Sequence, residues 1–599
     1  MKGKSVSVFL ISLVSVLLVL ASCGTGASTP TATTTSSKSP PVYTTSASTA
    51  PTSTPAASKP QYGGTFSFIY NEPSGFDPAN TLSVQIFSAL SFCQDEMLQG
   101  DWSKGPAGTG ETDWMAGYVG RVGLDTGSLA QSWEMPDAET IVFHIRQGVH
   151  FWNKPPVNGR ELTADDVAWS MNREWTSPRG FPSFWFKPQD RPTSFKALDK
   201  WTVQIKVPAA MQGALFVFVA DQTHIYAPEV VDKYGDYIDW RNQAGTGPYM
   251  LTDYVPASTL TYTRNPDYWM KDPLHPENQI PYVQTLKQFI ITDVSTQLAA
   301  FRTAKLDYRG IYPNVGWEDA QNLLQSNSQL KYKVVAGADK QLWMRTDKTD
   351  LPFKDVRVRQ ALNLAVSQKE IVDKYYQGHA DLLGHPYPPY KAWGPMYTPF
   401  DQMPASVQEL FGQNINKAKQ LLSDAGYPSG FKTNVVALSG PDIDFLSIIR
   451  EYFLKIGVDM EIKPLETGVF ASVNRMRQYD QMLYTGSPTA AFPYTMPSVV
   501  SETLDDKSYY ENPKTRAVFN QVNQYFGKDD AKWMQLLKDI TPFYLEQSVG
   551  IWMPLPQEYR MWWPWVLNYH GEGSLGYDNQ MAFTRYVWID QALKKSMGY

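Results

Sequence analysis

Residues 245–269, GTGPYMLTDYVPASTLTYTRNPDYW, give the clearest indication of the fold in this chain of 599 residues. The stretch predicts two β-strands, because two strand-like runs flank the turn-forming residues Pro256, Ala257 and Ser258. A buried strand followed by a helix is predicted for 288–308, and a helix with one apolar face for 355–366. Strands and helices therefore mix along the chain, which indicates α/β or α+β lobes.

The composition restricts the class of protein. Residues 61–599 are too many for one hydrophobic core, so we expect two to four lobes. The net charge is −6 and no basic run occurs, which argues against a nucleic-acid partner. No apolar stretch in this region approaches the roughly 18 residues that a membrane span needs. Aromatic residues make up 14% of the chain, which fits either aromatic-rich cores or an aromatic-lined ligand cleft.

The N-terminus has the pattern of an exported protein. A short positively charged start precedes an apolar run at 8–21, as in a signal peptide. Leu20–Cys23 resembles the bacterial lipobox, in which the cysteine is acylated and becomes the new N-terminus; a plain signal peptide or an uncleaved anchor is the alternative. We therefore expect residues 1–22 to be a lipoprotein signal peptide and Cys23 to carry the lipid anchor. Residues 23–60, rich in Ser, Thr, Pro and Ala, are then a disordered tether.

Catalytic and metal-site patterns are weak. With Cys23 lipidated, Cys93 has no partner in the chain, and we interpret it as a buried small hydrophobe and not a nucleophile. The glycines of 571–576 match a dinucleotide loop in spacing, but no helix pattern follows them. His144 and His150 flank a turn without a third ligand at metal-site spacing. We therefore expect no enzyme activity, no cofactor and no metal site.

Five segments, in this order, resemble the family 5 extracellular solute-binding proteins of ABC importers, the peptide- and nickel-binding group. The segments are FHIRQGVHF (143–151), LTADDV (162–167), the GTGPY…RNPDYW stretch, DVRVRQALNLAV and AKQLLSDAGYPSGF (418–431). The resemblance runs from about residue 62 to at least 480. The lipobox and the tether agree with it independently, because such a receptor must stay near its permease in the membrane.

The resemblance implies an α/β fold, a bilobal periplasmic-binding-protein-like clamshell of type II with an additional domain inserted in the first lobe. We place the first lobe at 61–95, 226–345 and 550–599, the inserted domain at 96–225 and the second lobe at 346–549. The ligand is expected between the lobes, and closure would present a surface to the permease.

One departure from the family concerns the ligand's charge. In peptide binders of this family an aspartate in the second lobe commonly holds the α-amino group, about nine residues after a tyrosine–aspartate pair. Tyr479–Asp480 matches the pair, but Thr489 stands at the expected place and no carboxylate occurs from 481 to 501. A buried ammonium without a counter-charge is costly. Either Asp480 or Glu502 substitutes for the missing aspartate, or the ligand lacks a free amine.

We predict that the site lies at strand ends near the lobe crossings. The expected ligand-contact residues are Tyr70, Asn71, Trp343, Arg345, Trp393, Asp480, Tyr484 and Thr485. The aromatic tail at 551–571 suits either hinge packing, which we favour, or a sugar-binding cleft.

The expected protein is a monomeric, lipid-anchored receptor on the extracytoplasmic face of the membrane. It would capture an oligopeptide or another small solute and deliver it to an ABC permease. An oligosaccharide receptor of the same fold is the alternative within this class, and a secreted hydrolase is the alternative outside it.

Overall fold

The largest sheet contains the predicted hairpin. The computed structural model describes residues 59–81, 84–115, 123–311, 314–486, 506–576 and 580–599. Within them the sheet runs in the order β12 (Val315–Gly316), β20 (Leu555–Trp562), β11 (Tyr308–Arg309), β1 (Thr65–Ile69), β10 (Thr285–Phe289), β9 (Thr259–Arg264) and β8 (Tyr249–Val255). Strands β8 and β9 pair antiparallel, and Ala257 adopts a φ of 56° in the turn between them. The hairpin predicted from 245–269 is therefore confirmed.

A second sheet has its own strand order. It consists of β17 (Asp459–Leu465), β16 (Lys432–Leu438), β18 (Met482–Gly486), β14 (Lys340–Met344) and β19 (Gly550–Ile551). Strand β16 is parallel to β17 and β18, whereas β14 is antiparallel to β18 and β19. Helix α12 (Pro441–Leu454) connects β16 to β17, as a parallel connection requires.

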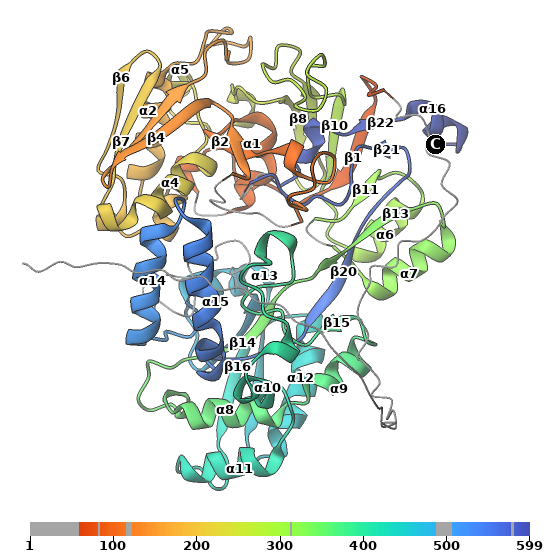
Figure 1. Ribbon diagram of the computed structural model, residues 1–599. Helices are drawn as coiled ribbons and strands as arrows, with labels where there is room; N and C mark the ends of the chain where they lie inside the picture. The colour runs from red at the N-terminus through yellow and green to blue at the C-terminus, as the bar shows by residue number, and fades with distance from the viewer. Residues whose placement is uncertain (1–58, 82–83, 116–122, 312–313, 487–505, 577–579) are drawn as a thin grey trace, which may run out of the picture. The chain divides into compact units, whose positions relative to one another are not determined.

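Two short connections join these two sheets, and we call them the crossings. Strand β13 (Lys331–Ala336) pairs with β20 in the first sheet, and only residues 337–339 separate it from β14 in the second sheet. The return is equally short, from β19 through 552–554 to β20 (Figure 1). The predicted lobe limits stay a prediction, although the pairing of β14 puts Lys340–Met344, which we assigned to the first lobe, in the second sheet.

A four-stranded antiparallel sheet lies within the range predicted for the inserted domain. Its order is β4 (Ala130–Asp137), β5 (Thr140–Ile145), β7 (Thr202–Lys206) and β6 (Ser194–Asp199). Helix α2 (Ala164–Thr176) packs on β6 and begins at a capping box formed by Thr163 and Asp166. This is the helix start that the sequence LTADDV indicates.

Further helices surround the three larger sheets (Figure 1). The longer ones are α4 (Gln212–Asp221), α6 (Val294–Arg302), α7 (Trp317–Ser326), α8 (Val356–Ala365), α11 (Ile415–Asp424), α13 (Thr467–Met476), α14 (Pro513–Tyr525) and α15 (Asp530–Glu546). The shorter ones are α1 (Phe87–Cys93), α3 (Pro182–Trp185), α5 (Pro228–Tyr234), α9 (Gln368–Glu370), α10 (Ala405–Leu410) and α16 (Gln591–Ser596). Four of the remaining strands form two short pairs, β2 (Leu98–Gly100) with β3 (Asp125–Gly127) and β21 (Val566–Leu567) with β22 (Trp588–Ile589). Strand β15 (Ala380–Asp381) pairs with β20.

The aromatic tail is part of the core. Trp563 and Trp565 are fully buried and stack on each other, with ring centroids 4.7 Å apart. The indole N–H of Trp565 donates to Asp307 Oδ1 at 2.7 Å, and that of Trp563 donates to the carbonyl of Phe301 at 3.1 Å. Packing, the interpretation that we favoured for this segment, accounts for these tryptophans.

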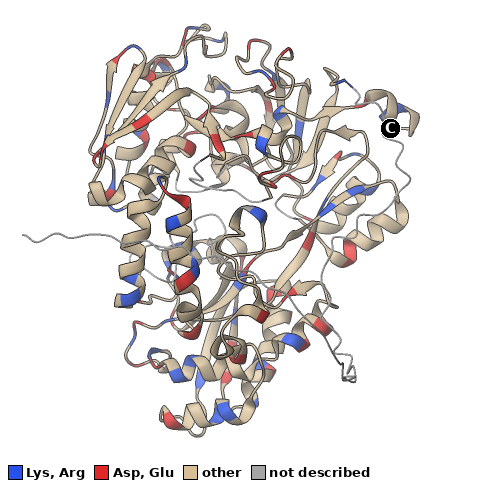
Figure 2. Cartoon of the chain, viewed as in Figure 1, with Lys and Arg blue, Asp and Glu red and all other residues tan. Residues whose placement is uncertain are grey.

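Cys93 is free and buried at the end of α1, and burial raises the pKa of its thiol to about 12. A thiol in that state is protonated and inert. Cys23 and residues 24–58 of the predicted tether lie outside the described residues. Figure 2 shows Lys and Arg interspersed with Asp and Glu over the described elements. No helix in these elements has the length and apolar character needed to cross a membrane.

Candidate functional site

A cavity of about 660 Å³ lies beside both chain crossings. We call it the hinge groove. One wall comes from the start of α7 and from β20, which belong to the first sheet and its covering helices. The other wall comes from β14, β18, the start of α12 and residues 375–379. A solute in the groove would therefore touch elements of both sheets at once. Its volume is within the usual range for small-molecule sites, roughly 300–1,000 Å³.

Aromatic rings form much of the lining. Trp317, the first residue of α7, stacks on His379 with ring centroids 4.1 Å apart. On the opposite wall Phe445 stacks on Tyr484 at 5.8 Å and packs against Tyr375 at 5.1 Å. Such faces suit apolar side chains, sugar rings and organic cations.

Charged groups of the groove are mainly carboxylates. Lys340, the first residue of β14, pairs with Asp442 at the start of α12, with 2.6 Å between Nζ and Oδ1. Glu318 and Asp319 lie in the first turn of α7, where the helix dipole favours negative charge. Burial lowers the pKa of His379, so this ring is neutral near pH 7.

Glu558 contributes the fourth carboxylate, from the middle of β20. It accepts a hydrogen bond from Asn314 Nδ2 at 2.9 Å and forms no ion pair with any described residue. Burial raises the pKa of this carboxyl, although Asn314, Lys340, Arg560 and Arg309 act in the opposite direction. The buried Oδ1 of Asn314 has no hydrogen-bond partner. Asn314 does not line the groove, so Glu558 alone presents acceptor capacity to it at this point.

The ligand-contact residues predicted in the second sheet do not come together. Tyr484 lines the groove. The neighbouring Thr485 is buried, and its carbonyl accepts the indole N–H of Trp343 at 3.3 Å inside the sheet. Arg345 and Asp480 lie at the other end of the β14–β18 pair, where Arg345 N donates to Gln481 O at 2.9 Å. At about 3.3 Å per residue, Asp480 and Thr485 are separated by roughly 16 Å along the strand.

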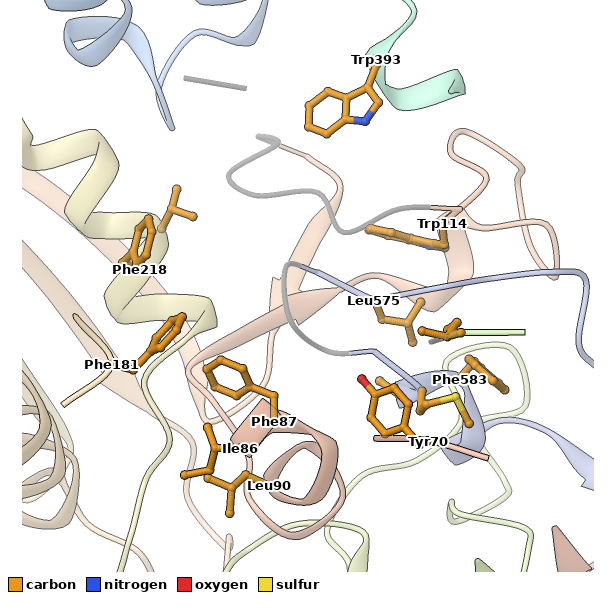
Figure 3. Close-up of a cluster of buried hydrophobic side chains, with 14 of the residues drawn as sticks. Tyr70, Ile86, Phe87, Leu90, Trp114, Phe181, Phe218, Trp393, Leu575 and Phe583 are labelled. Atoms are coloured by element: carbon orange, nitrogen blue, oxygen red, sulfur yellow. The ribbon is translucent and has the colours of Figure 1, made fainter. Parts of the chain in front are cut away.

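The remaining predicted residues lie on other segments. Tyr70 follows β1 and donates its hydroxyl to Gln580 Oε1, and the Asn71 carbonyl accepts from Gln288 Nε2 at 2.8 Å. Trp393 is fully buried in a turn whose Lys391 N–H donates to Asp113 Oδ2 at 3.1 Å. Figure 3 shows Trp393 together with Trp114 and Tyr70 in the buried cluster to which all three belong.

Sequence reasoning missed most of the groove. Trp317, Lys340, Tyr375, Asp442 and Glu558 were not among the expected residues. A carboxylate in the middle of the strand LPQEYRMW, at the return crossing, is the signal that could have identified Glu558. Thr489 and Glu502 lie outside the described residues. Over the described ranges, no group of three His, Cys, Asp or Glu side chains could hold a metal ion.

Comparison with known proteins identifies the family. The family model for bacterial extracellular solute-binding proteins, family 5 Middle, matches residues 126–508. Heme-binding protein A of Haemophilus influenzae is 29% identical over 55% of this chain, which corresponds to 60% of that protein's length. Di/tripeptide-binding protein 1 of Pseudomonas aeruginosa is 26% identical over 69% of this chain and 73% of its own length.

Solved structures show the fold. The periplasmic binding protein DppA from Helicobacter pylori, in complex with the peptide STSA, superposes with a TM-score of 0.67 at 20% sequence identity. The superposition covers 89% of this chain and 99% of that chain. The fold is the bilobal type II periplasmic-binding-protein fold that the resemblance implied. The family match spans well over half of the sequence, and the chain belongs to the family 5 extracellular solute-binding proteins of ABC importers.

Proposed function

We propose that this chain is an extracytoplasmic receptor that captures a peptide-like solute in the hinge groove and delivers it to an ABC importer. The supporting observation is the position of the groove, whose lining comes from both sheets beside both crossings. A ligand that contacts both walls favours the arrangement in which they are close, and this couples occupancy to closure. The importer would then distinguish the loaded receptor from the empty one.

The names of the relatives set the range of solutes to test. Di/tripeptide-binding protein 1 and the DppA complex with STSA point to short peptides. Heme-binding protein A points to a large planar ligand, which the aromatic lining of the groove would also suit. We favour peptides, because the groove combines apolar faces with carboxylates and hydrogen-bonding groups that match a peptide's amine and amides. An oligosaccharide receptor remains the alternative, since the same rings could stack on sugars.

Thermal unfolding of the purified protein tests the solute class. A solute that binds only the folded protein stabilises it by about 2.7 kcal/mol at a hundredfold excess over Kd. We expect a mixed di- to tetrapeptide pool to raise the melting temperature, and free nickel to leave it unchanged. A shift with malto-oligosaccharides or haem alone would contradict the peptide assignment. A catalytic role would require turnover of the bound solute, which mass spectrometry of the incubated peptides would detect.

Lipid anchoring is the second part of the proposal, and it rests on Leu20–Cys23. Cys23→Ser removes the thiol that takes the lipid, so we expect the variant to leave the membrane fraction. Cys93→Ser is the matched control, because Cys93 is buried in the folded part of the chain. Retention of the Cys23→Ser protein in washed membranes would contradict lipid anchoring and leave the solute assignment intact.

A further inference from the structure

A second cavity, of about 550 Å³, lies apart from the hinge groove, and we call it the junction pocket. Most of its lining comes from the β2–β3 pair, from the turn after β5 and from the loop after β9. These segments belong to the ranges predicted for the inserted domain and for the first lobe. The described residues that line it include none from the second sheet and none that line the hinge groove.

Packed side chains form the inner wall of the junction pocket. Trp102 and Tyr586 stack with their ring planes 3° apart and their centroids 4.6 Å apart, and each side chain is 1% exposed. The side-chain amide of Gln99 donates to the Tyr586 hydroxyl at 3.5 Å. Met270 and Pro273 add apolar surface to the lining. The wall is therefore formed before any ligand arrives, as in most small-molecule sites.

One cation of the lining is partly buried without a carboxylate partner among the described residues. The Arg146 guanidinium lies over the ring of Trp269, with Cζ 4.9 Å from the ring centroid. Its Nε donates to the Ser128 carbonyl at 2.9 Å and its Nη2 to the Gly127 carbonyl at 3.2 Å. Burial lowers the pKa of Arg146, and Tyr268 is the group that acts in the opposite direction. Arg146 therefore brings a partly desolvated charge to the pocket, with Nη1 left to donate.

A second cation completes the charge of the lining. Lys271 is exposed, lies two positions after Trp269, and its ammonium forms no ion pair with any described residue. Asp101 is the one carboxylate among the described lining residues, and its Oδ1 accepts from Ser103 N at 2.9 Å and from Ser103 Oγ at 2.6 Å. Two cations and one carboxylate leave the pocket positive, although the whole chain has a net charge of −6.

We propose that the junction pocket binds a small organic carboxylate, with Arg146 Nη1 and the Lys271 ammonium donating to its two oxygens and Trp269 contacting its apolar body. A carboxylate is an acceptor-only group that suits two cationic donors, whereas an organic cation would meet two like charges. The apolar surface of Met270 and Pro273 distinguishes such a ligand from an inorganic anion. This site goes beyond the proposed function, because none of these residues lines the hinge groove.

Calorimetry of the full chain with three probes of matched shape tests the site. The probes are 3-phenylpropanoate, 3-phenylpropanamide and 3-phenylpropylamine, which carry a negative charge, no charge and a positive charge. We expect the carboxylate to bind roughly tenfold more tightly than the amide, and the amine not to bind, because charge-assisted hydrogen bonds are the stronger ones.

Four variants assign the effect to residues. Lys271→Ala should weaken binding of 3-phenylpropanoate several-fold, and Arg146→Met roughly tenfold. Asp101→Asn keeps the oxygen that caps Ser103 and removes the negative charge, so it should tighten binding. Lys305→Ala is the matched control, an exposed lysine outside the lining, and it should change nothing. Melting curves without ligand show whether a variant is folded. Lys271→Ala decides the matter if Arg146→Met is not.

The contrary outcomes are distinct. Equal affinity for 3-phenylpropanoate and its amide, or an undiminished preference in Lys271→Ala and Arg146→Met, overturns the site. Displacement of bound 3-phenylpropanoate by tetra-alanine would place it in the hinge groove and would also overturn the site. Binding of inorganic phosphate without any binding of 3-phenylpropanoate overturns the organic ligand. None of these results bears on the peptide receptor, which the melting experiment with the peptide pool tests separately.

Discussion

The two ends of the β14–β18 strand pair carry similar residue types, but only one end lines the hinge groove. At one end Lys340 and Tyr484 border the hinge groove, where Glu558 has no ion-pair partner among the described residues. At the other end Arg345 forms a bidentate pair with Asp347, with 2.6 and 2.7 Å between nitrogen and oxygen. The same guanidinium lies 3.8 Å from the ring centroid of Tyr509. Arginine, tyrosine and aspartate are typical of binding sites, yet here they satisfy one another.

The difference teaches that unmet hydrogen-bonding capacity identifies the candidate site better than residue type does. Arg345 and Asp480 were predicted as ligand contacts because they lie at predicted strand ends near the lobe crossings. Arg345 has no free donor set to offer, since its third nitrogen donates to the Tyr479 carbonyl at 2.9 Å. Glu558 lines the groove, and within the described residues it accepts one hydrogen bond and forms no ion pair.

The largest expected effect comes from removing the residue that lies between the two ends. Trp343 is 1% exposed in the centre of β14, so Trp343→Ala leaves a cavity in the second sheet. We expect a loss of about 3–5 kcal/mol in the free energy of unfolding, measured by urea titration. Val469→Ala, at a residue 55% exposed, should stay within about 0.5 kcal/mol. A small change for Trp343→Ala would mean that the sheet collapses around the missing ring.

Asp506 should make the free energy of unfolding depend on pH, and it lies near the end of the β14–β18 pair away from the groove. Burial raises the pKa of Asp506 to about 7, while its Oδ1 accepts from Ser508 N and Oγ at 3.0 and 2.8 Å. Between about pH 4 and 7 the native state holds a proton that the unfolded state has lost, so this group's stabilising contribution falls as the pH rises, by up to about 1.4 kcal/mol per pH unit. Asp506→Asn should flatten the stability profile in that window. Parallel profiles for variant and parent would show that Asp506 is ionised in the folded protein.

Truncating Arg345, at the end of the β14–β18 pair away from the groove, should reduce stability and leave solute binding unchanged. Arg345→Ala removes a partly buried ion pair and three hydrogen bonds, and we expect a loss of about 1–3 kcal/mol in unfolding free energy. Calorimetric affinity for tetra-alanine should stay within twofold of the parent value, because Arg345 lies outside the groove. A tenfold loss of affinity at unchanged stability would restore Arg345 as a ligand residue and reverse the comparison.

Truncating Lys340, at the groove end of the β14–β18 pair, should change binding and have the smallest effect on stability. Lys340→Ala removes a partly exposed ion pair, so the unfolding free energy should change by less than about 1 kcal/mol. Asp442 is then released to face the groove, and affinity for 1,5-diaminopentane should rise several-fold because the cavity becomes more acidic. Weaker diamine binding in this variant would indicate that Lys340 orders the groove and does not oppose the ligand's charge.

The sequence allowed the local elements and the family to be predicted, but little of the groove. The β8–β9 hairpin and the start of α2 follow from turn and capping residues, which act over a few positions. Tyr484 was expected near the ligand and lies in the groove. Glu558 and Asn314 are 244 positions apart, and they meet only because β12 and β20 pair. Strand periodicity shows which face a residue occupies and not which distant strand lies beside it.

The two crossings have a mechanical consequence. The backbone N–H of Gly337 donates to the Pro556 carbonyl at 2.7 Å, and that of Met553 donates to Gln341 Oε1 at 2.7 Å. Two short connections fastened to each other resist independent torsion, whereas a single connection would swivel. Rotation of one half against the other is thereby reduced to essentially one degree of freedom, a bend about the line of the paired segments. If the receptor opens and closes as proposed, the groove walls would follow the same trajectory in each cycle, whatever the wall residues are. Substitutions in the groove can therefore change the preferred solute without changing the path of the motion.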